Sequence, residues 1–264
     1  MPTDDLSGRI AIVTGATAGI GRAVAEDLAA RGARLILNAR RAEKLTQLTR
    51  TLNAARPEPL AAAAPGDAAD QAVIDSMLTA AVTHFGAEAD IIVVNAGRGL
   101  SGSVISSDPA QWEDMLRTNV LGAARLLRAA ALRMAADIVR RDAGNWQARP
   151  RDLIAIGSVV GRHVSPFSSM YGSTKFAVHG MVEGVRRELA SKGIRVSLIE
   201  PGFVVSEFQG VAGYQDDWFK GVVERIGPVL QPADVAAAVS FICRQPPHVH
   251  VGDILIRPTR QDYP

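Results

Sequence analysis

Two side chains in the run Tyr171-Gly-Ser-Thr-Lys175 have the types and spacing needed for proton transfer. A phenol and an ammonium four residues apart on a helix share one face. The ammonium favours the phenolate, so we expect Lys175 to lower the pKa of Tyr171 from its ordinary value of ~10 toward the range where acid–base catalysis works. Taken alone, such a pair is more often a packing or surface pair, and a cofactor loop elsewhere in the chain changes that reading.

That loop is the glycine-rich stretch Thr14 to Gly21, which follows an apolar run and opens a helical pattern. Gly15 permits a tight turn, Gly19 lets the backbone approach a phosphate, and Gly21 allows close contact between helix and strand. The helix N-terminus offers unpaired N–H groups and a partial positive charge to a pyrophosphate. The loop therefore predicts dinucleotide binding, with Thr17, Ala18 and Ile20 completing it.

The second apolar run ends in Leu37-Asn-Ala-Arg-Arg41, where an NAD-selective site favours an acidic residue. Arg40 instead offers a planar cation suited to the 2′-phosphate of NADP, and Arg41 follows it. The alternative is a solvent-exposed arginine pair in an arginine-rich chain. We predict NADP (NADPH) as the cofactor.

Short apolar runs alternate with helix-length amphipathic segments along the whole chain. Runs that are apolar at nearly every position are typical of parallel strands covered on both faces. The pattern predicts an α/β fold, a doubly wound Rossmann sheet of about seven parallel strands with helices on both faces, in a single domain spanning 1–264. The run at 60–64 is also compatible with a helix because of its four alanines. The expected strands contain 10–13, 35–37, 60–64, 91–94, 153–156, 196–199 and 254–256.

Two segments depart from this alternation. Residues 109–142 are expected to form one long helix or two joined helices. The segment 203–226 is rich in aromatic residues and glycines and follows a strand end, where open α/β sheets bind ligands. It is either a substrate-binding lid over a mostly apolar substrate or an aromatic part of the core.

Composition excludes several classes of protein. The 264 residues are 47% hydrophobic, enough for a large core, and the net charge of +2 gives no reason to expect nucleic acid as a partner. The single cysteine, Cys243, excludes an internal disulfide framework, and His248 with His250 is a poor metal site, so no metal is expected. No apolar run approaches the ~18 residues of a membrane span, and the start has no secretion signal. We expect a cytoplasmic protein with no membrane partner.

With these motifs in order, the sequence resembles the short-chain dehydrogenase/reductase family over nearly its whole length. Within that family it is similar to the NADP-dependent serine and 3-hydroxy acid dehydrogenases. The residues that carry the resemblance are Thr14 to Gly21, Asp67, Asn95-Ala-Gly97, Asn119, Ser158, Tyr171 with Lys175, and Pro201-Gly202.

The resemblance implies a role for each matching residue. Tyr171 is the general acid in carbonyl reduction and the base in alcohol oxidation, and Ser158 hydrogen-bonds the substrate oxygen. Lys175 binds the nicotinamide ribose, and Asn119 holds the water of a proton relay. On the cofactor, Asp67 meets the adenine, Asn95, Ala96 and Gly97 flank the adenosine, and Pro201, Gly202, Val204 and Ser206 contact the nicotinamide part.

The sequence thus predicts an NADP-dependent oxidoreductase that moves hydride between nicotinamide and a ketone, aldehyde or 3-hydroxy/3-oxo acid. Alternatives are an NAD-linked alcohol dehydrogenase and a non-catalytic dinucleotide sensor on the same fold. Arg98 and His163 follow cleft-lining motifs and could bind a substrate carboxylate, or they are solvated loop residues. Phe203, Phe208 and Trp218 are the apolar substrate candidates. The resemblance also implies a homotetramer, or a homodimer.

Overall fold

A parallel sheet forms the centre of the protein. The structure, a computed structural model, describes residues 5–54, 57–163, 165–214 and 216–263, and within them seven parallel strands pair in the order β3-β2-β1-β4-β5-β6-β7. This confirms the predicted sheet, including the alanine-rich run, which pairs with its neighbour from Leu35 opposite Ala61. The strands are β1 (Ile10–Thr14), β2 (Arg34–Ala39), β3 (Ala61–Pro65), β4 (Ile91–Val94), β5 (Asp152–Ile156), β6 (Arg195–Pro201) and β7 (Asp253–Ile256).

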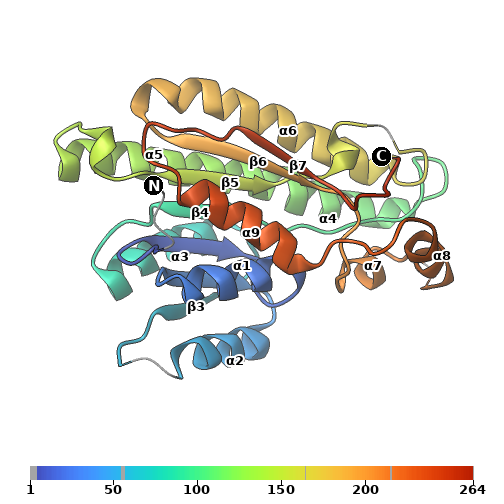
Figure 1. Cartoon of the computed structure of the whole chain (residues 1–264), viewed down its shortest axis with the longest axis horizontal. Helices are drawn as coiled ribbons and strands as arrows, with labels where there is room; N and C mark the ends of the chain where they lie inside the picture. The colour runs from blue at the N-terminus through green and yellow to red at the C-terminus, as the bar shows by residue number, and fades with distance from the viewer. Residues whose placement is uncertain (1–4, 55–56, 164, 215, 264) are drawn as a thin grey trace.

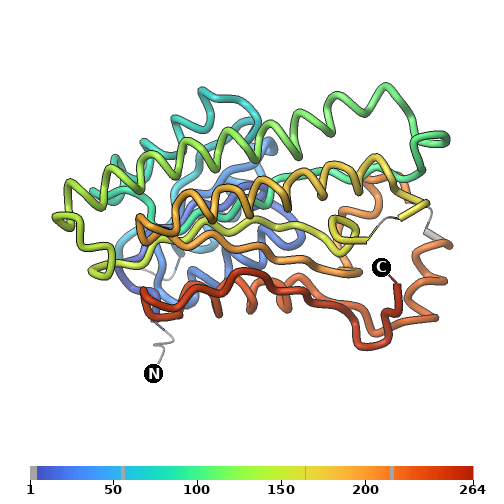
Figure 2. Tube along the Cα trace, turned by 90° about the horizontal axis from the view of Figure 1, so that it is seen from above, coloured from blue at the N-terminus to red at the C-terminus, as the bar shows by residue number. Residues whose placement is uncertain are grey.

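Helices cover both faces of the sheet because alternate residues of each strand point to opposite sides. In β1, Ala11 and Val13 pack with α1 (Gly19–Ala30), α2 (Ala42–Asn53) and α9 (Pro232–Cys243). Ile10 and Ile12 pack on the other side with α3 (Gln71–Phe85), α5 (Ala123–Asp142) and α6 (Ser169–Leu189). Figures 1 and 2 show α5 and α6 running side by side along that face. None of the described helices is long and apolar enough to cross a bilayer.

The long segment after β4 is a series of joined helices. It runs from η1 (Pro109–Gln111) through α4 (Trp112–Leu116) and the π-helical η2 (Arg117–Gly122) into α5. Isolated π-helical turns inside longer helices are often found at functional sites. Here the π-helical turn carries Asn119, so the irregular part of the helix coincides with a predicted catalytic position.

The remaining elements lie at the strand ends. At the carboxyl edge, η4 (Val159–Gly161) follows β5, while α7 (Phe208–Val211) and α8 (Asp216–Ile226) follow β6. Figure 1 shows α7 and α8 together at one end of the molecule. They form the segment predicted as a lid, of which residue 215 lies outside the described residues. The other short elements are η3 (Trp146–Ala148) and η5 (Ala190–Lys192).

Buried charges join four neighbouring strands at the opposite, amino edge. Arg9, just before β1, pairs with Asp90 at 2.7 Å and with Asp152 at 2.8 Å. Asp152 in turn pairs with Arg195, the first residue of β6, at 2.7 Å. All four side chains are at least nine-tenths buried, so their charges are compensated mainly by one another. We call Arg9, Asp90, Asp152 and Arg195 the amino-edge network.

The connection between α5 and β5 is also held by a buried arginine. Arg151, 1% exposed, lies 2.7 Å from Asp137 and 2.6 Å from Asp142 through the same nitrogen. In the same stretch, Trp146 packs against the backbone of Gly193 so closely that a Cβ there would lie 2.4 Å from its ring. Residues 142–151 therefore fold back onto the sheet at the edge away from the cleft.

The amino-edge network should make a large contribution to stability. Asp152→Asn removes one carboxylate charge and leaves two buried guanidinium groups with less compensation. We expect the free energy of unfolding in urea to fall by about 3–5 kcal/mol. The matched control is Glu26→Gln, which breaks the exposed Arg22–Glu26 pair and should cost at most about 1 kcal/mol. Equal losses of unfolding free energy in Asp152→Asn and Glu26→Gln would contradict a stabilising role for the amino-edge network.

Candidate functional site

A cleft of about 830 Å³ opens at the carboxyl edge of the sheet, lined by the loops after β1 to β6 and by α7 and α8. Most of the predicted site residues line it. From the cofactor and catalytic sets these are Gly15, Thr17, Ala18, Gly19, Ile20, Arg40, Arg41, Asp67, Asn95, Ala96, Gly97, Ser158, Tyr171, Lys175, Pro201, Gly202, Val204 and Ser206. From the substrate set they are Arg98, Phe203, Phe208 and Trp218. Gly21, Asn119 and His163 are not among the lining residues.

The glycine-rich loop is held in place by a buried threonine. The Thr14 hydroxyl accepts hydrogen bonds from the backbone N–H groups of Asn95 and Ala96, both at 3.0 Å, and donates to the Val93 carbonyl. The Asn95 amide donates to the Thr14 carbonyl at 2.8 Å. A Cβ on Gly21 would lie 2.3 Å from the Gly15 carbonyl oxygen. Gly21 therefore shapes the loop from behind without lining the cleft.

The same loop leaves the start of α1 open to a ligand. Gly15 and Gly19 have φ values of +67° and +50°, a region that favours glycine. Ala18, at the N-cap, has no side-chain hydrogen bond to the first turn, so the first N–H groups of α1 stay available. This cradle fits the pyrophosphate of a dinucleotide, which the helix N-terminus would bind.

Arginines of the loop after β2 lie at the far end of the cleft. Arg41 pairs with Glu207 at 2.9 Å and donates to the Thr17 hydroxyl. Arg40 is exposed on the cleft, and its charge acts on Asp67. Burial would raise the pKa of Asp67, but the Ala69 N–H, Arg117 and Arg40 together hold it below its ordinary value, so Asp67 is a carboxylate.

Tyr171, Lys175 and Ser158 meet at the wall of the cleft. Tyr171 and Lys175 lie on one face of α6, with the Lys175 nitrogen 5.8 Å from the centre of the Tyr171 ring. That nitrogen donates a hydrogen bond to the Ile156 carbonyl at 2.8 Å, at the end of β5. Ser158, two residues further on, lines the same cleft, and its side chain acts on Tyr171 to lower the pKa of the phenol. The spacing predicted from sequence thus brings three reactive groups together.

Burial changes the protonation expected for this pair. The sequence predicts a lowered Tyr171 pKa, but burial raises the pKa of the phenol, and the nearby Tyr214 adds to the rise, against a smaller opposing effect of Ser158. Burial also lowers the pKa of Lys175 to about 8. The expected lowering of the Tyr171 pKa is wrong for the protein alone, because burial desolvates both the phenol and the ammonium. Tyr171 is therefore held as a protonated phenol.

The Asn119 side chain hydrogen-bonds two neighbouring parts of the protein. Its oxygen accepts from the Arg98 N–H at 2.8 Å, and its nitrogen donates to the Arg98 carbonyl and to the Thr174 hydroxyl. Thr174 in turn donates to the Tyr171 carbonyl. Asn119 therefore ties the loop after β4 to the helix that carries Tyr171. The water-holding role implied by the resemblance stays a prediction.

Aromatic side chains form the apolar half of the cleft. Phe208 packs on Tyr171 with ring centres 5.5 Å apart, and Trp218 stacks on Tyr214 at 4.9 Å and contacts Phe203 at 6.1 Å. Phe203, Phe208, Tyr214 and Trp218 belong to the segment 203–226, so this segment forms the wall of the cleft next to Tyr171. Its function as a lid stays a prediction.

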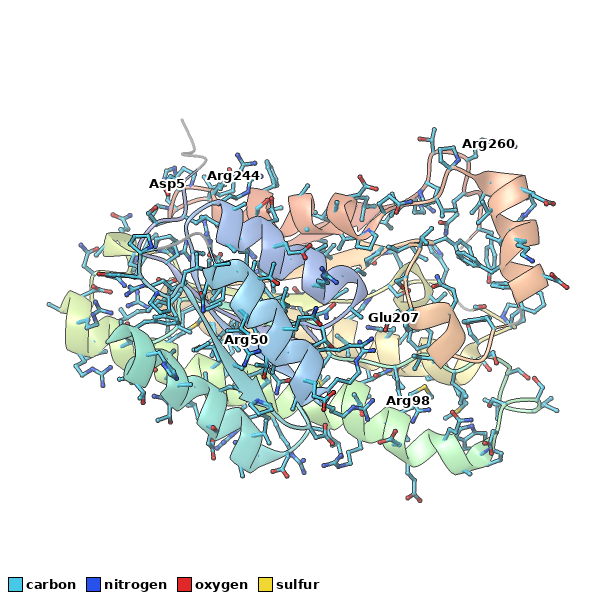
Figure 3. All side chains as sticks on the ribbon, turned by 90° about the horizontal axis from the view of Figure 1, so that it is seen from below. Asp5, Arg50, Arg98, Glu207, Arg244 and Arg260 are labelled. Carbon is cyan, nitrogen blue, oxygen red and sulfur yellow. The ribbon has the colours of Figure 1, made fainter. Side chains whose placement is uncertain are left out.

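The two proposed carboxylate ligands are placed differently. Arg98 lines the cleft, but its guanidinium pairs with Asp114 and donates to Gln111 at 2.7 Å. His163 is exposed and lies outside the lining of the cleft. Figure 3 shows Arg98 and Glu207 toward the end of the molecule that carries α7 and α8. The structure therefore brings Arg98 to the site with its charge already compensated.

Three residues near the site were not predicted. Glu207 pairs with Arg41, Tyr214 raises the pKa of Tyr171, and His179 contacts the Ser158 backbone. His179 follows Lys175 by four residues, so helical spacing could have indicated it. Among the described residues no three His, Cys, Asp or Glu side chains gather so that they could hold a metal ion.

Comparison with known proteins gives a consistent result. The family model described as short chain dehydrogenase matches residues 9–216. An uncharacterized oxidoreductase of Staphylococcus aureus is 32% identical over 253 residues, covering 96% of this chain and 98% of the relative. A similar protein of Staphylococcus epidermidis is 30% identical over 250 residues, covering 95% of this chain and 97% of the relative.

Solved structures agree in fold. The closed form of a serine dehydrogenase complexed with NADP⁺ superposes with a TM-score of 0.82 and 30% identity, covering 96% of both chains. A 3-ketoacyl-(acyl-carrier-protein) reductase from Brucella melitensis superposes with a TM-score of 0.84 at 22% identity, covering 97% of this chain and 99% of that one. The second likeness supports the fold alone.

The lowered pKa of Lys175 can be measured directly because the chain has only four lysines. With the lysine ε-carbons labelled with ¹³C, we expect one NMR signal to titrate with a midpoint of about 8, compared with an ordinary 10.5. Lys175→Arg should remove that signal and Lys192→Arg should leave it. A Lys175 midpoint near 10.5 would mean that the ammonium is not desolvated.

Proposed function

Because the chain belongs to the short-chain dehydrogenase family, we propose that it is an NADP-dependent oxidoreductase that interconverts a carbonyl compound and its alcohol. The observation that carries this proposal is the meeting of Ser158, Tyr171 and Lys175 in the cleft that also contains the phosphate cradle. When bound, the nicotinamide supplies or accepts the hydride. The protein supplies the proton and the positions of the reacting groups.

Each of the three residues has a distinct part in the proposed reaction. Burial keeps Tyr171 protonated, so it can donate its proton to a carbonyl oxygen as negative charge develops there. The Ser158 hydroxyl donates a hydrogen bond to the same oxygen. Lys175, fixed by the Ile156 carbonyl, places a positive charge beside the phenolate that remains. In alcohol oxidation the Tyr171 phenolate accepts the proton of the substrate hydroxyl.

The cofactor preference rests on the two arginines after β2. Arg41 is engaged by Glu207 and Thr17, whereas Arg40 is exposed on the cleft close enough to act on Asp67. We therefore propose Arg40 as the principal ligand of a 2′-phosphate. The similar serine dehydrogenase is complexed with NADP⁺, which supports NADP as the proposed cofactor.

The substrate is proposed to be a ketone or aldehyde with an apolar alkyl or aryl substituent. Phe203, Phe208 and Trp218 wall the cleft beside Tyr171, and mostly apolar pockets of this kind take apolar ligands. Arg98 is engaged by Asp114, which disfavours the idea that it recognises a substrate carboxylate. Segment 203–226 acts in this proposal as the lid over the substituent.

A homotetramer or homodimer in the cytoplasm stays a prediction. The oligomer is supported by exposed apolar side chains on η2, α5 and α6, which a second copy would cover. Leu121, Leu132, Val139 and Phe176 are respectively 50%, 56%, 72% and 43% exposed.

The proposed reaction is tested by NADPH oxidation over a panel of alkyl and aryl ketones, aldehydes and 3-oxo acids. Tyr171→Phe removes the transferable proton, so kcat should fall by about 10²- to 10⁴-fold while NADPH affinity is retained. Tyr214→Phe removes a second phenol of the cleft lining and should lose far less kcat. Near-normal turnover of Tyr171→Phe would contradict the mechanism, and preference for 3-oxo acids would contradict the proposed substrate class.

The proposed cofactor preference is tested with a pair of arginine variants. Arg40→Ala removes the charge that faces a 2′-phosphate, so the Kd for NADPH should rise by roughly 10- to 100-fold and that for NADH by less than about 3-fold. Arg41→Ala should be less selective because Glu207 engages that residue. Equal losses for both cofactors in Arg40→Ala would contradict the assignment.

A further inference from the structure

A histidine outside the cleft contacts the backbone of the proposed catalytic serine. Tyr171, Lys175 and His179 are spaced four residues apart on α6 and form one stripe toward the loop after β5. Lys175 donates to the Ile156 carbonyl, and the pKa of Tyr171 is lowered by the nearby Ser158 side chain. His179, through Nε2, accepts a long hydrogen bond of 3.4 Å from the Ser158 N–H.

Two glycines make room for the His179 ring. A Cβ on Gly157 would lie 2.5 Å from Nε2, and a Cβ on Gly161 would lie 2.4 Å from the same atom. Neither glycine has a positive φ, so backbone conformation does not require glycine at either position. Glycine is required at both positions because the His179 ring takes the space that a side chain would need. The loop that carries Ser158 is therefore wrapped around His179 on both sides.

A buried carboxylate lies beside the ring. Glu200, in β6, is fully buried, and its Oε2 lies 3.7 Å from Nδ1 of His179. The same carboxylate accepts from Nε of Arg162 at 2.7 Å. Burial lowers the pKa of His179 to about 4, partly opposed by Glu200 and helped by Lys175 and Arg162. The imidazole is therefore neutral at neutral pH, with Nδ1–H toward Glu200 and Nε2 free to accept.

We propose that His179, oriented by Glu200, is a positioning residue that holds the Ser158 backbone so that its hydroxyl meets Tyr171 and the substrate oxygen. The inference rests on the proposed function for its effect on turnover, but the contact itself can be measured without any substrate. His179 touches neither substrate nor cofactor, because it lies behind the loop, outside the lining of the cleft.

The test compares three substitutions with one control. His179→Leu fills the space without an acceptor, His179→Gln can bring an amide oxygen near the place of Nε2, and His179→Asn is too short to reach it. We expect His179→Leu and His179→Asn to lower kcat by about 5- to 100-fold, and His179→Gln to keep most of the wild-type kcat. The Kd for NADPH should change by less than about twofold in all three variants. Val178→Ala, a buried change on the same helix, should lower Tm but leave kcat within about twofold.

An NMR measurement separates this inference from the proposed reaction. The Ser158 amide proton should move upfield in the Leu and Asn variants and return toward its wild-type position in Gln. An unchanged Ser158 amide signal, or equal kcat values for His179→Gln and His179→Asn, would overturn the inference. The comparison of these two variants can be made even if His179→Leu does not fold. Turnover that survives Tyr171→Phe in a protein with His179 intact would instead overturn the proposed function.

Discussion

The amino-edge network fixes the frame on which everything else is built. Four adjacent strands begin with charges that compensate one another in a region almost closed to water, and Asp152 contacts arginines before β1 and in β6 at once. Burying such charges is favourable only in close, well-oriented pairs, which leaves the strands little freedom to slide. With register fixed at one edge, the positions of the strand ends at the other edge are fixed as well.

The cleft built on those ends has two unlike halves. The half that fits a dinucleotide is mostly backbone: glycines, an uncapped helix start and the hydrogen bonds around Thr14. The half that would receive a substrate is mostly side chain, contributed by the segment after β6. Backbone geometry is set by the sheet, whereas the shape of the other half depends on how a few aromatic rings pack. With this division, substitutions in the segment after β6 can change substrate specificity while the cofactor half stays the same.

Sequence reasoning succeeded where the signal is local. The apolar runs, the glycine loop before α1 and the spacing of Tyr171 and Lys175 each depend on neighbours within a few residues, and each appears in the structure as predicted. It failed where a partner lies far along the chain. Arg41 meets Glu207, and Arg98 meets Asp114, and neither pairing has a periodic signal. The direction of the Tyr171 pKa was also wrong, because burial depends on every element packed around the phenol.

The close fit of the His179 ring between Gly157 and Gly161 has a consequence for how this chain can vary. A side chain at either glycine collides with the ring, and a smaller residue at 179 leaves a gap beneath the serine loop. Substitutions here should therefore be accepted in evolution as sets. In an alignment of homologues, these positions should covary, with the small residues at 157 and 161 retained wherever a ring is found at 179.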